Sequence, residues 1–493
     1  MKLKTENLAE LRADIFRPEY VRGNVSQGIV HIGVGGFHRA HQAIYIEKLL
    51  TRNEAHEWGI CGVGLRDEDR AMQQALESQD YLYTLYELGA SNAKQIQVVG
   101  AIGNYLLAPD NAEAVILKLL ESETRIVSLT ITEGGYCTDD GTGEFLAELP
   151  QIRYDLEHPQ APVTVFGFLV EALARRRDAG VAPFTVMSCD NLPHNGTVTR
   201  NAVLSFAALR DVELRDWIAD NVTFPNGMVD RITPMTSDVH RRQLEDETGI
   251  QDAWPVVAEP FLQWVLEDKF CNGRPALENV GVQFTDDVTP YEEMKIRLLN
   301  GGHQALVYLG VLLGHRFVHE TMQDSQLRGF VRAYMDGDVT PLLADVPGID
   351  LEAYKDCLLE RFSNTAIGDQ LSRIGYDGSS RLPKFIIPTL LERIEAGASL
   401  QRLALILAAW CHYQQGIDEN GDAFEVADLR LDQIQSAARP GIDQVERFLG
   451  LEELFGQALP KSPSFVEAFR LQLDRLQRLG ARGTLELTMA DEQ

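Results

Sequence analysis

Short apolar runs alternate with helical patterns through the first half of the chain, and this alternation limits the possible folds more than any other feature. The runs that predict buried strands are IVHIG at 29–33, GICGVGL at 59–65, RIVSLTI at 125–131 and FTVMS at 184–188. Segment 111–122 between them has helical periodicity, whereas 163–169 suits either a strand or the start of a helix. Uninterrupted apolar strands separated by helices favour a parallel sheet covered on both faces.

The pattern changes after about residue 290, where strand signals nearly vanish. Helical spacing continues through 293–315, 322–336, 351–362, 385–416 and 464–479. Pro290, in an acidic stretch just before a helical pattern, is typical of a boundary. We therefore predict the α/β class, with an α/β domain at 1–286. A mainly α-helical domain follows at 287–493.

Composition excludes several kinds of partner. The 45 basic and 73 acidic residues give a net charge of −28, which disfavours nucleic acid and anionic membranes. The longest apolar runs, 305–314 and 403–411, are shorter than the ~20 residues of a membrane-spanning helix. The N-terminus lacks the apolar core of a signal peptide, and the six scattered cysteines form no C-x-x-C pair. We expect a cytoplasmic protein with a small-molecule substrate, no metal, and no evident obligatory protein partner.

A glycine-rich turn follows the first predicted strand directly. Gly33, Gly35 and Gly36 lie where that strand must turn into a helix, and glycine lets the backbone approach a pyrophosphate closely. The third glycine of the usual G-x-G-x-x-G pattern is replaced by His38. The alternative is a tight turn without a ligand, but the position at the first strand favours a dinucleotide. The predicted cofactor-binding residues of this turn are Gly33, Gly35, Gly36, Phe37, His38 and Arg39.

An acidic turn ends the second predicted strand. Glu68 and Asp69 stand about where a carboxylate could accept the ribose 2′-hydroxyl bond, which would favour NAD over NADP. Their spacing from the glycines is longer than usual, and Arg66 beside them could attract a phosphate. A solvated acidic turn is the alternative interpretation.

Three polar residues share a helix at the start of the second half. At 100° per residue, Lys295, His303 and Asn300 lie at about 0°, 80° and 140° on the helical wheel. Partial desolvation on an apolar helix would lower the pKa of the lysine and suit it to act as a general base. The asparagine and histidine could hold an alcohol or carbonyl oxygen. A surface lysine and a core histidine explain the pattern equally well.

Glu292 lies three residues before Lys295, so the two can share a helical face. We predict that Glu292 tunes Lys295 or relays its proton to solvent. The alternative is an exposed glutamate that merely suits the first turn of a helix.

Four motifs together resemble the long-chain polyol dehydrogenase family and span most of the chain. They are IGVGGFHRAHQ at 32–42, SCDNLPHNG at 188–196, FPNGMVDRITP at 224–234 and KIRLLNGGH at 295–303. The resemblance implies NAD-dependent, metal-independent oxidation of D-mannitol at C2 to D-fructose, and the reverse reduction. It also implies that 1–286 is a Rossmann-type dinucleotide-binding domain and 287–493 the substrate and catalytic domain, with the active site at their interface.

The resemblance also implies a role for individual residues. Lys295 would be the general acid–base, Asn191 and Asn300 would polarise the reacting oxygen, and His303 and Asp230 would bind and orient the substrate. Arg373 and Arg381 would add substrate contacts, although many members have lysine where this chain has Arg381. By themselves, Asn191 could be a loop residue and Asp230 part of a structural ion pair with Arg231. Glu133, in the predicted cofactor set with Asn191, could lie near the nicotinamide or merely cap a turn.

Other functions remain open. The same family includes fructuronate and tagaturonate reductases, and Arg373, Arg381 or Lys384 could bind the carboxylate of a hexuronate. A non-catalytic NAD-binding sensor is disfavoured by the complete set of Lys, Asn and His residues. A zinc-dependent alcohol dehydrogenase is disfavoured by the cysteine spacing.

Overall fold

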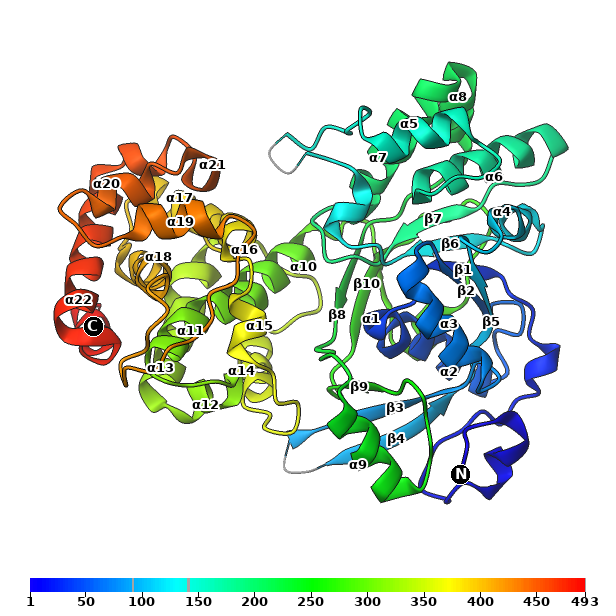
Figure 1. Ribbon diagram of the computed structural model, residues 1–493, viewed down its shortest axis with the longest axis horizontal. Coiled ribbons are helices and arrows are strands. Elements are labelled where there is room, and N and C mark those ends of the chain that lie inside the picture. The colour runs from blue at the N-terminus through cyan, green and yellow to red at the C-terminus, as the bar shows by residue number, and fades with distance from the viewer. Residues whose placement is uncertain (91–92, 140–141, 493) are drawn as a thin grey trace. The chain divides into compact units, whose positions relative to one another are not determined.

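The computed structural model describes residues 1–90, 93–139 and 142–492. Its contacts divide the chain into two compact units, Met1–Thr289 and Pro290–Gln493 (Figure 1).

A five-stranded parallel sheet forms the centre of the first unit. Its strands are β1 (Ile29–Ile32), β2 (Ile60–Gly64), β5 (Ile102–Leu107), β6 (Ile126–Leu129) and β7 (Thr185–Ser188), in the order β5-β2-β1-β6-β7. Four of them are the strands predicted from the apolar runs. The chain passes from β1 outward to β2 and β5, and then returns to the other side of β1 for β6 and β7. The order therefore reverses between β1 and β6, as in a Rossmann fold.

The central sheet carries a hydrophobic core on each face, because neighbouring side chains of a strand point to opposite faces. Ile29 and Ile126 belong to one core, and Val30 and Val127 belong to the other. The first core is covered by α2 (Gln42–Thr51) and α3 (Arg70–Glu77). The second is covered by α4 (Ala112–Leu120), α6 (Val165–Ala179) and α7 (Asn195–Arg210). The predicted two-sided parallel sheet is thus confirmed.

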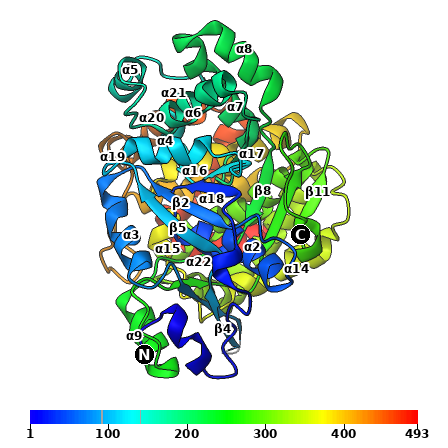
Figure 2. The ribbon, with the colours of Figure 1, turned by 90° about the vertical axis from the view of Figure 1, so that its right-hand side faces the viewer.

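Two small sheets accompany the central one. Strands β8 (Gly227–Asp230), β10 (Gln263–Glu267) and β11 (Gln283–Thr285) form the first, and β3 (Tyr83–Leu88), β4 (Lys94–Val99) and β9 (Val256–Ala258) form the second. Beside β4 and α9 (Asp238–Thr248) lies the N-terminal segment, in both views (Figure 1, Figure 2). The apolar runs of the sequence do not predict these strands, and β4 and β11 are only partly buried. The remaining helices of the unit are α1 (Gly36–Ala40), α5 (Pro150–Glu157) and α8 (Val212–Asn221).

The second unit is built from helices. A continuous helical segment opens it as α10 (Thr289–Met294), a π-helix η7 (Lys295–Asn300) and α11 (Gly301–Leu312). Every residue of α11 is buried, and α11 packs against α18 (Gln401–Tyr413), which packs against the C-terminal α22 (Pro463–Asp491). The others are α12 (Val318–Gln323), α13 (Ser325–Ala333), the π-helix η8 (Tyr334–Val339), α14 (Leu351–Phe362), α15 (Leu371–Gly375), α16 (Gly378–Phe385), α17 (Ile387–Glu395), α19 (Leu431–Ala438), α20 (Gln444–Leu449) and α21 (Glu452–Phe455).

Local signals explain where the helices differ from the expected ranges. In the ambiguous segment 163–169 the helix α6 begins at Val165, because the Thr164 side chain accepts a hydrogen bond from the Gly167 amide and caps α6. Segment 385–416 divides into separate helices, with Gly397 at φ 61° after α17. Gly480, at φ 72°, interrupts the long α22.

Candidate active site

The glycine turn lies at the carboxyl end of β1. Gly33 has φ 93°, and a Cβ there would collide with the Thr130 carbonyl oxygen, so only glycine fits. A Cβ at Gly35 would meet only the Gly33 oxygen, at 3.9 Å, so its backbone borders open space. Because the strand order reverses between β1 and β6, this open backbone lies at the crevice where doubly wound sheets bind ligands. The turn therefore fits a closely approaching pyrophosphate.

The side chains that follow the glycines point into the protein. The ring of Phe37 stacks on His41, with 4.9 Å between centroids. Buried His38 stacks on His31 at 3.4 Å, and burial lowers the pKa of both imidazoles, that of His31 to about 3. Arg39 is buried and donates to the Trp254 carbonyl oxygen. These three residues can thus serve a cofactor mainly through their main chain.

The acidic turn after β2 separates its two carboxylates. Asp69 accepts hydrogen bonds from the amides of Leu65 and Arg66, both at 3.0 Å, so it caps its own turn. Glu68 is exposed, and no hydrogen bond to its side chain occurs within the described residues. Glu68 is therefore the carboxylate that is free to meet a ribose.

Two further predicted residues follow β6 and β7, which are adjacent strands. Glu133 begins the 3₁₀ helix η5 (Glu133–Tyr136), and its side chain is exposed. Asn191 is also exposed, three residues beyond the end of β7. Since parallel strands end at one edge of a sheet, both side chains lie on the edge that carries the glycine turn.

Asp230 ends β8 and is buried. The adjacent Arg231 forms an ion pair with Glu87 and donates to the carbonyl oxygens of Ala40 and Glu259. Arg231 thus has a structural role of its own in joining β8 to the neighbouring segments.

In the second unit, Lys295 and Asn300 are the first and last residues of the π-helix η7. Hydrogen bonds from i to i+5 give more residues per turn than an α-helix, so residues five apart lie closer to one face than the 140° of the wheel implies. Lys295 is 6% exposed and His303 is 7% exposed, with the His303 ring 4.2 Å from that of Phe362. The Asn300 Oδ1 atom is buried without a hydrogen-bond partner among the described residues. An unsatisfied buried acceptor is costly, which suggests that a ligand completes it.

Glu292 is 5% exposed and lies one turn before Lys295. The interpretation of Glu292 as an exposed helix-start residue is therefore wrong, because its side chain is buried.

The three cationic residues predicted to contact substrate differ in their surroundings. Arg373 makes a two-bond ion pair with Asp369, at 2.7 and 2.6 Å. Arg381 donates to the carbonyl oxygens of Arg373 and Ile374, at 3.2 and 2.8 Å. Lys384 is exposed.

Two kinds of feature are absent from the part of the chain that the structure describes. No group of three or more His, Cys, Asp or Glu side chains there could hold a metal ion. Within the same residues, no helix has the length and apolar character needed to cross a membrane.

The first unit has a Rossmann-order sheet with an open glycine turn, and the second unit carries a buried lysine and a buried amide oxygen. These features are typical of a dinucleotide-dependent oxidoreductase. Residues 27–279 match the family described as the mannitol dehydrogenase Rossmann domain, and residues 287–477 match the mannitol dehydrogenase C-terminal domain. The chain therefore belongs to the mannitol dehydrogenase family of polyol dehydrogenases, which confirms the resemblance seen in the motifs.

Curated relatives and solved structures agree with this assignment. The chain is 46% identical to mannitol 2-dehydrogenases of Neosartorya fischeri and Aspergillus fumigatus, over 98% of both chains in each case. The Pseudomonas fluorescens mannitol 2-dehydrogenase, solved as a ternary complex with NAD and D-mannitol, is 58% identical. It aligns over 99% of this chain and 100% of its own, with a TM-score of 0.92. A D-sorbitol dehydrogenase solved without substrate is 41% identical over 98% of this chain and 100% of its own, with a TM-score of 0.89.

Proposed function

We propose that this protein oxidises D-mannitol at C2 to D-fructose with NAD, and catalyses the reverse reduction. The observation that carries the proposal is the η7 helix, which combines a buried lysine with a buried amide oxygen that lacks a protein partner. The likeness to the NAD and D-mannitol complex of the Pseudomonas fluorescens enzyme supports this choice of substrate and cofactor.

Lys295 is the general base in this proposal. Burial of the side chain favours a neutral amine over a charged ammonium, and the neutral amine takes the proton of the C2 hydroxyl. Glu292, buried one turn away, takes the proton onward to solvent. In the reverse direction, the protonated lysine returns the proton to the oxygen of the ketose.

Amide side chains hold the reacting oxygen. Asn191 and Asn300 each have an NH₂ donor that can stabilise the developing negative charge. His303 and Asp230 bind neighbouring hydroxyl groups, and Arg373 contacts the far end of the sugar chain. Bound NAD supplies the acceptor for the hydride that leaves C2.

The cofactor is held by the first unit in this proposal. The main chain of Gly33, Gly35 and Gly36 receives the pyrophosphate, and Glu68 accepts the ribose 2′-hydroxyl bond. A 2′-phosphate would be repelled by that carboxylate, which favours NAD over NADP. No metal ion is required, because the lysine and the two amides supply the base and the oxygen-stabilising donors.

A hexuronate is the less favoured substrate. Its carboxylate needs a cation, but Arg373 is already neutralised by Asp369, and Arg381 is engaged by two carbonyl oxygens. Lys384 is the remaining candidate cation.

Initial rates separate the two substrates. We expect robust NADH formation from D-mannitol with NAD, and little NADH consumption with fructuronate or tagaturonate. A higher kcat/KM for either hexuronate would reject the polyol assignment. Tight NADH binding without turnover of any polyol or ketose would instead identify a sensor.

A further inference from the structure

A strained threonine stands at the carboxyl end of β6. Thr132 has φ 61° and ψ 169°, a backbone conformation that is essentially limited to glycine. A β-branched residue keeps such a conformation only where neighbouring groups hold it, and residues of this kind cluster at functional sites. Cys137, at the end of the same turn, and His194, beyond β7, also have positive φ angles, of 52° and 51°.

The carboxylate of Asp190 holds this turn from the neighbouring strand. Its two oxygens accept the amides of Ile131 and Thr132, each at 3.0 Å, and the hydroxyl of Tyr136 at 2.7 Å. Asp190 is only 9% exposed and Tyr136 is fully buried. Burial raises the pKa of Tyr136 well above its ordinary value, so the hydroxyl stays protonated and keeps donating. All three of these hydrogen bonds to the Asp190 carboxylate come from one turn, residues 131–136.

The same turn is tied to the glycine turn on its other side. Thr130 Oγ1 donates to the Gly33 carbonyl oxygen at 2.6 Å, and the imidazole of His31 lies 2.9 Å from that hydroxyl. Residues 130–132 thus form one connected strip from Gly33 to Asp190, and Asp190 immediately precedes Asn191.

We propose that Asp190 is a positioning residue for the cofactor: its carboxylate holds the strained backbone of Ile131 and Thr132 between the glycine turn and Asn191. The strip so held forms the wall of the site that receives the nicotinamide end of NAD. This assignment rests on the proposed function, since it takes Asn191 as the group that meets the reacting oxygen. Neither Asp190 nor Thr132 touches the substrate in this proposal.

Binding of NADH to the whole chain, followed by its fluorescence, tests the proposal. Asp190→Asn keeps the size of the side chain but replaces one acceptor oxygen with an NH₂ donor, so the turn loses at least one of the hydrogen bonds that hold it. We expect the Kd for NADH to rise about tenfold, the size of effect typical of a lost buried hydrogen bond to a charged group. Amide exchange at residues 130–136 should also become faster.

The double variant Asp190→Asn with Thr132→Gly is the sharper measurement. Glycine adopts the required φ without the hydrogen bonds of Asp190, so the Kd of the double variant for NADH should return to within about threefold of the wild-type value. A residue that merely stabilised the fold would not be rescued in this way.

Asp155 provides a matched control. It too is a buried aspartate that accepts two backbone amides, of Val163 and Thr164 at 2.7 and 2.9 Å, and a hydroxyl, that of Thr164. It lies in α5, and its bonds hold residues 163–164 before α6 instead of residues 130–132. Asp155→Asn should lower Tm and leave the Kd for NADH unchanged.

Three results would overturn the proposal: a Kd for Asp190→Asn within twofold of wild type, the same rise in Kd for Asp155→Asn, or no rescue by Thr132→Gly. If Asp190→Asn does not fold, Tyr136→Phe removes one of the three donors and should still raise the Kd about threefold. An unchanged Kd in that variant would be equally decisive. Because NADH binding needs no polyol, a wild-type protein that binds NADH but leaves D-mannitol unchanged would reject the proposed reaction without affecting this test.

Discussion

Lys295 is buried on a helix face that also carries Asn300, and the proposed chemistry depends on its amine. Lys295→Ala should lower kcat by about 10²–10⁴-fold, the usual contribution of a general base, while NADH binding survives. Lys118, whose side chain is 11% exposed and pairs with Glu121, is the matched control. Its replacement by alanine should leave kcat unchanged. A Lys295→Ala protein that works within a few-fold of wild type would remove this residue from the mechanism.

Burial of Glu292 supports a relay role, because a carboxylate close to the base can carry its proton outward. Glu292→Gln should slow mannitol oxidation and shift its pH profile, since glutamine cannot take up the proton. The neighbouring Glu293 is less buried, and Glu293→Gln is the control that should leave the pH profile unchanged. Superimposable pH profiles and kcat values for Glu292→Gln and wild type would show that the glutamate serves only the helix.

Glu68 and Asp69 contribute differently to cofactor choice. Glu68→Lys should raise the ratio of kcat/KM for NADP to that for NAD, because an anion that repels the 2′-phosphate becomes a cation that can pair with it. Adding Asp69→Ala should raise the ratio further but lower Tm, since two backbone amides lose their acceptor. Asp67→Lys makes the same charge change one residue earlier, and an equal effect there would point to general electrostatics.

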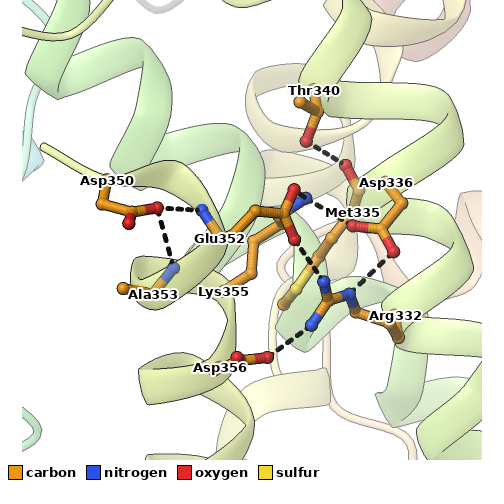
Figure 3. A network of polar contacts seen from close by, with 9 residues as sticks. All are labelled: Arg332, Met335, Asp336, Thr340, Asp350, Glu352, Ala353, Lys355 and Asp356. Atoms are coloured by element: carbon orange, nitrogen blue, oxygen red, sulfur yellow. Dashed lines mark hydrogen bonds and ion pairs between the residues drawn. The ribbon is translucent and has the colours of Figure 1, made fainter.

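At the scale of elements, the two π-helices of the second unit support each other. The hydroxyl of Tyr334, in η8, donates to the Arg297 carbonyl oxygen of η7 at 3.1 Å, and a Cβ at Gly301 would collide with that hydroxyl. Figure 3 shows how η8 is itself held: Asp336 binds Arg332 and Lys355, and the Thr340 hydroxyl donates to the Met335 carbonyl oxygen. The π-helix η7, which brings Lys295 towards Asn300, is thus bonded to a second π-helix that is itself stabilised by ion pairs and hydrogen bonds.

Tyr334→Phe should therefore lower kcat several-fold with a smaller change in KM, because η7 loses the bond that holds its wider turn. Tyr20→Phe, which removes a buried hydroxyl bonded to Glu47 at 2.8 Å, is the control in the other unit. Both variants should lose about 1 kcal/mol of stability. Equal kcat values in the two variants would mean that Tyr334 contributes to folding alone.

At the scale of the whole molecule, one buried acid links stability to pH. Burial raises the pKa of Glu47 to about 7, although its carboxylate accepts bonds from Tyr20 and from the Gly100 amide. Between about pH 4.5 and 7 the folded protein holds a proton here that the unfolded chain releases. This acid therefore makes stability fall as pH rises through that window, by at most about 3 kcal/mol.

Glu47→Gln should remove that fall. Thermal unfolding from pH 5 to pH 8 should show a variant that resembles wild type at pH 5 and is more stable than wild type at pH 8. Glu57, an exposed glutamate, serves as the control when changed to glutamine. Parallel Tm curves for Glu47→Gln and wild type would refute the linkage.

Local sequence was enough to predict four of the five strands of the central sheet, the glycine turn and the longer helices of the second unit. A buried strand such as IVHI, or a helix with an apolar stripe, can be recognised from neighbouring residues alone. Gly33 is needed because a side chain at that one position would collide with the backbone. The alternation of strand and helix signals along the chain also indicated a Rossmann-type fold, and the four motifs indicated the polyol dehydrogenase family.

Tertiary contacts decided the rest, because they join residues whose spacing in the chain carries no signal. Asp190 caps amides that lie 58 and 59 residues earlier. Tyr334 bonds a carbonyl 37 residues away. The apolar pattern of a π-turn resembles that of an α-helix, so the wheel placed Lys295 and Asn300 too far apart. Glutamate is usually exposed, so the sequence gives no sign that Glu292 is buried. Only the packing of the helices around it takes its carboxylate out of water.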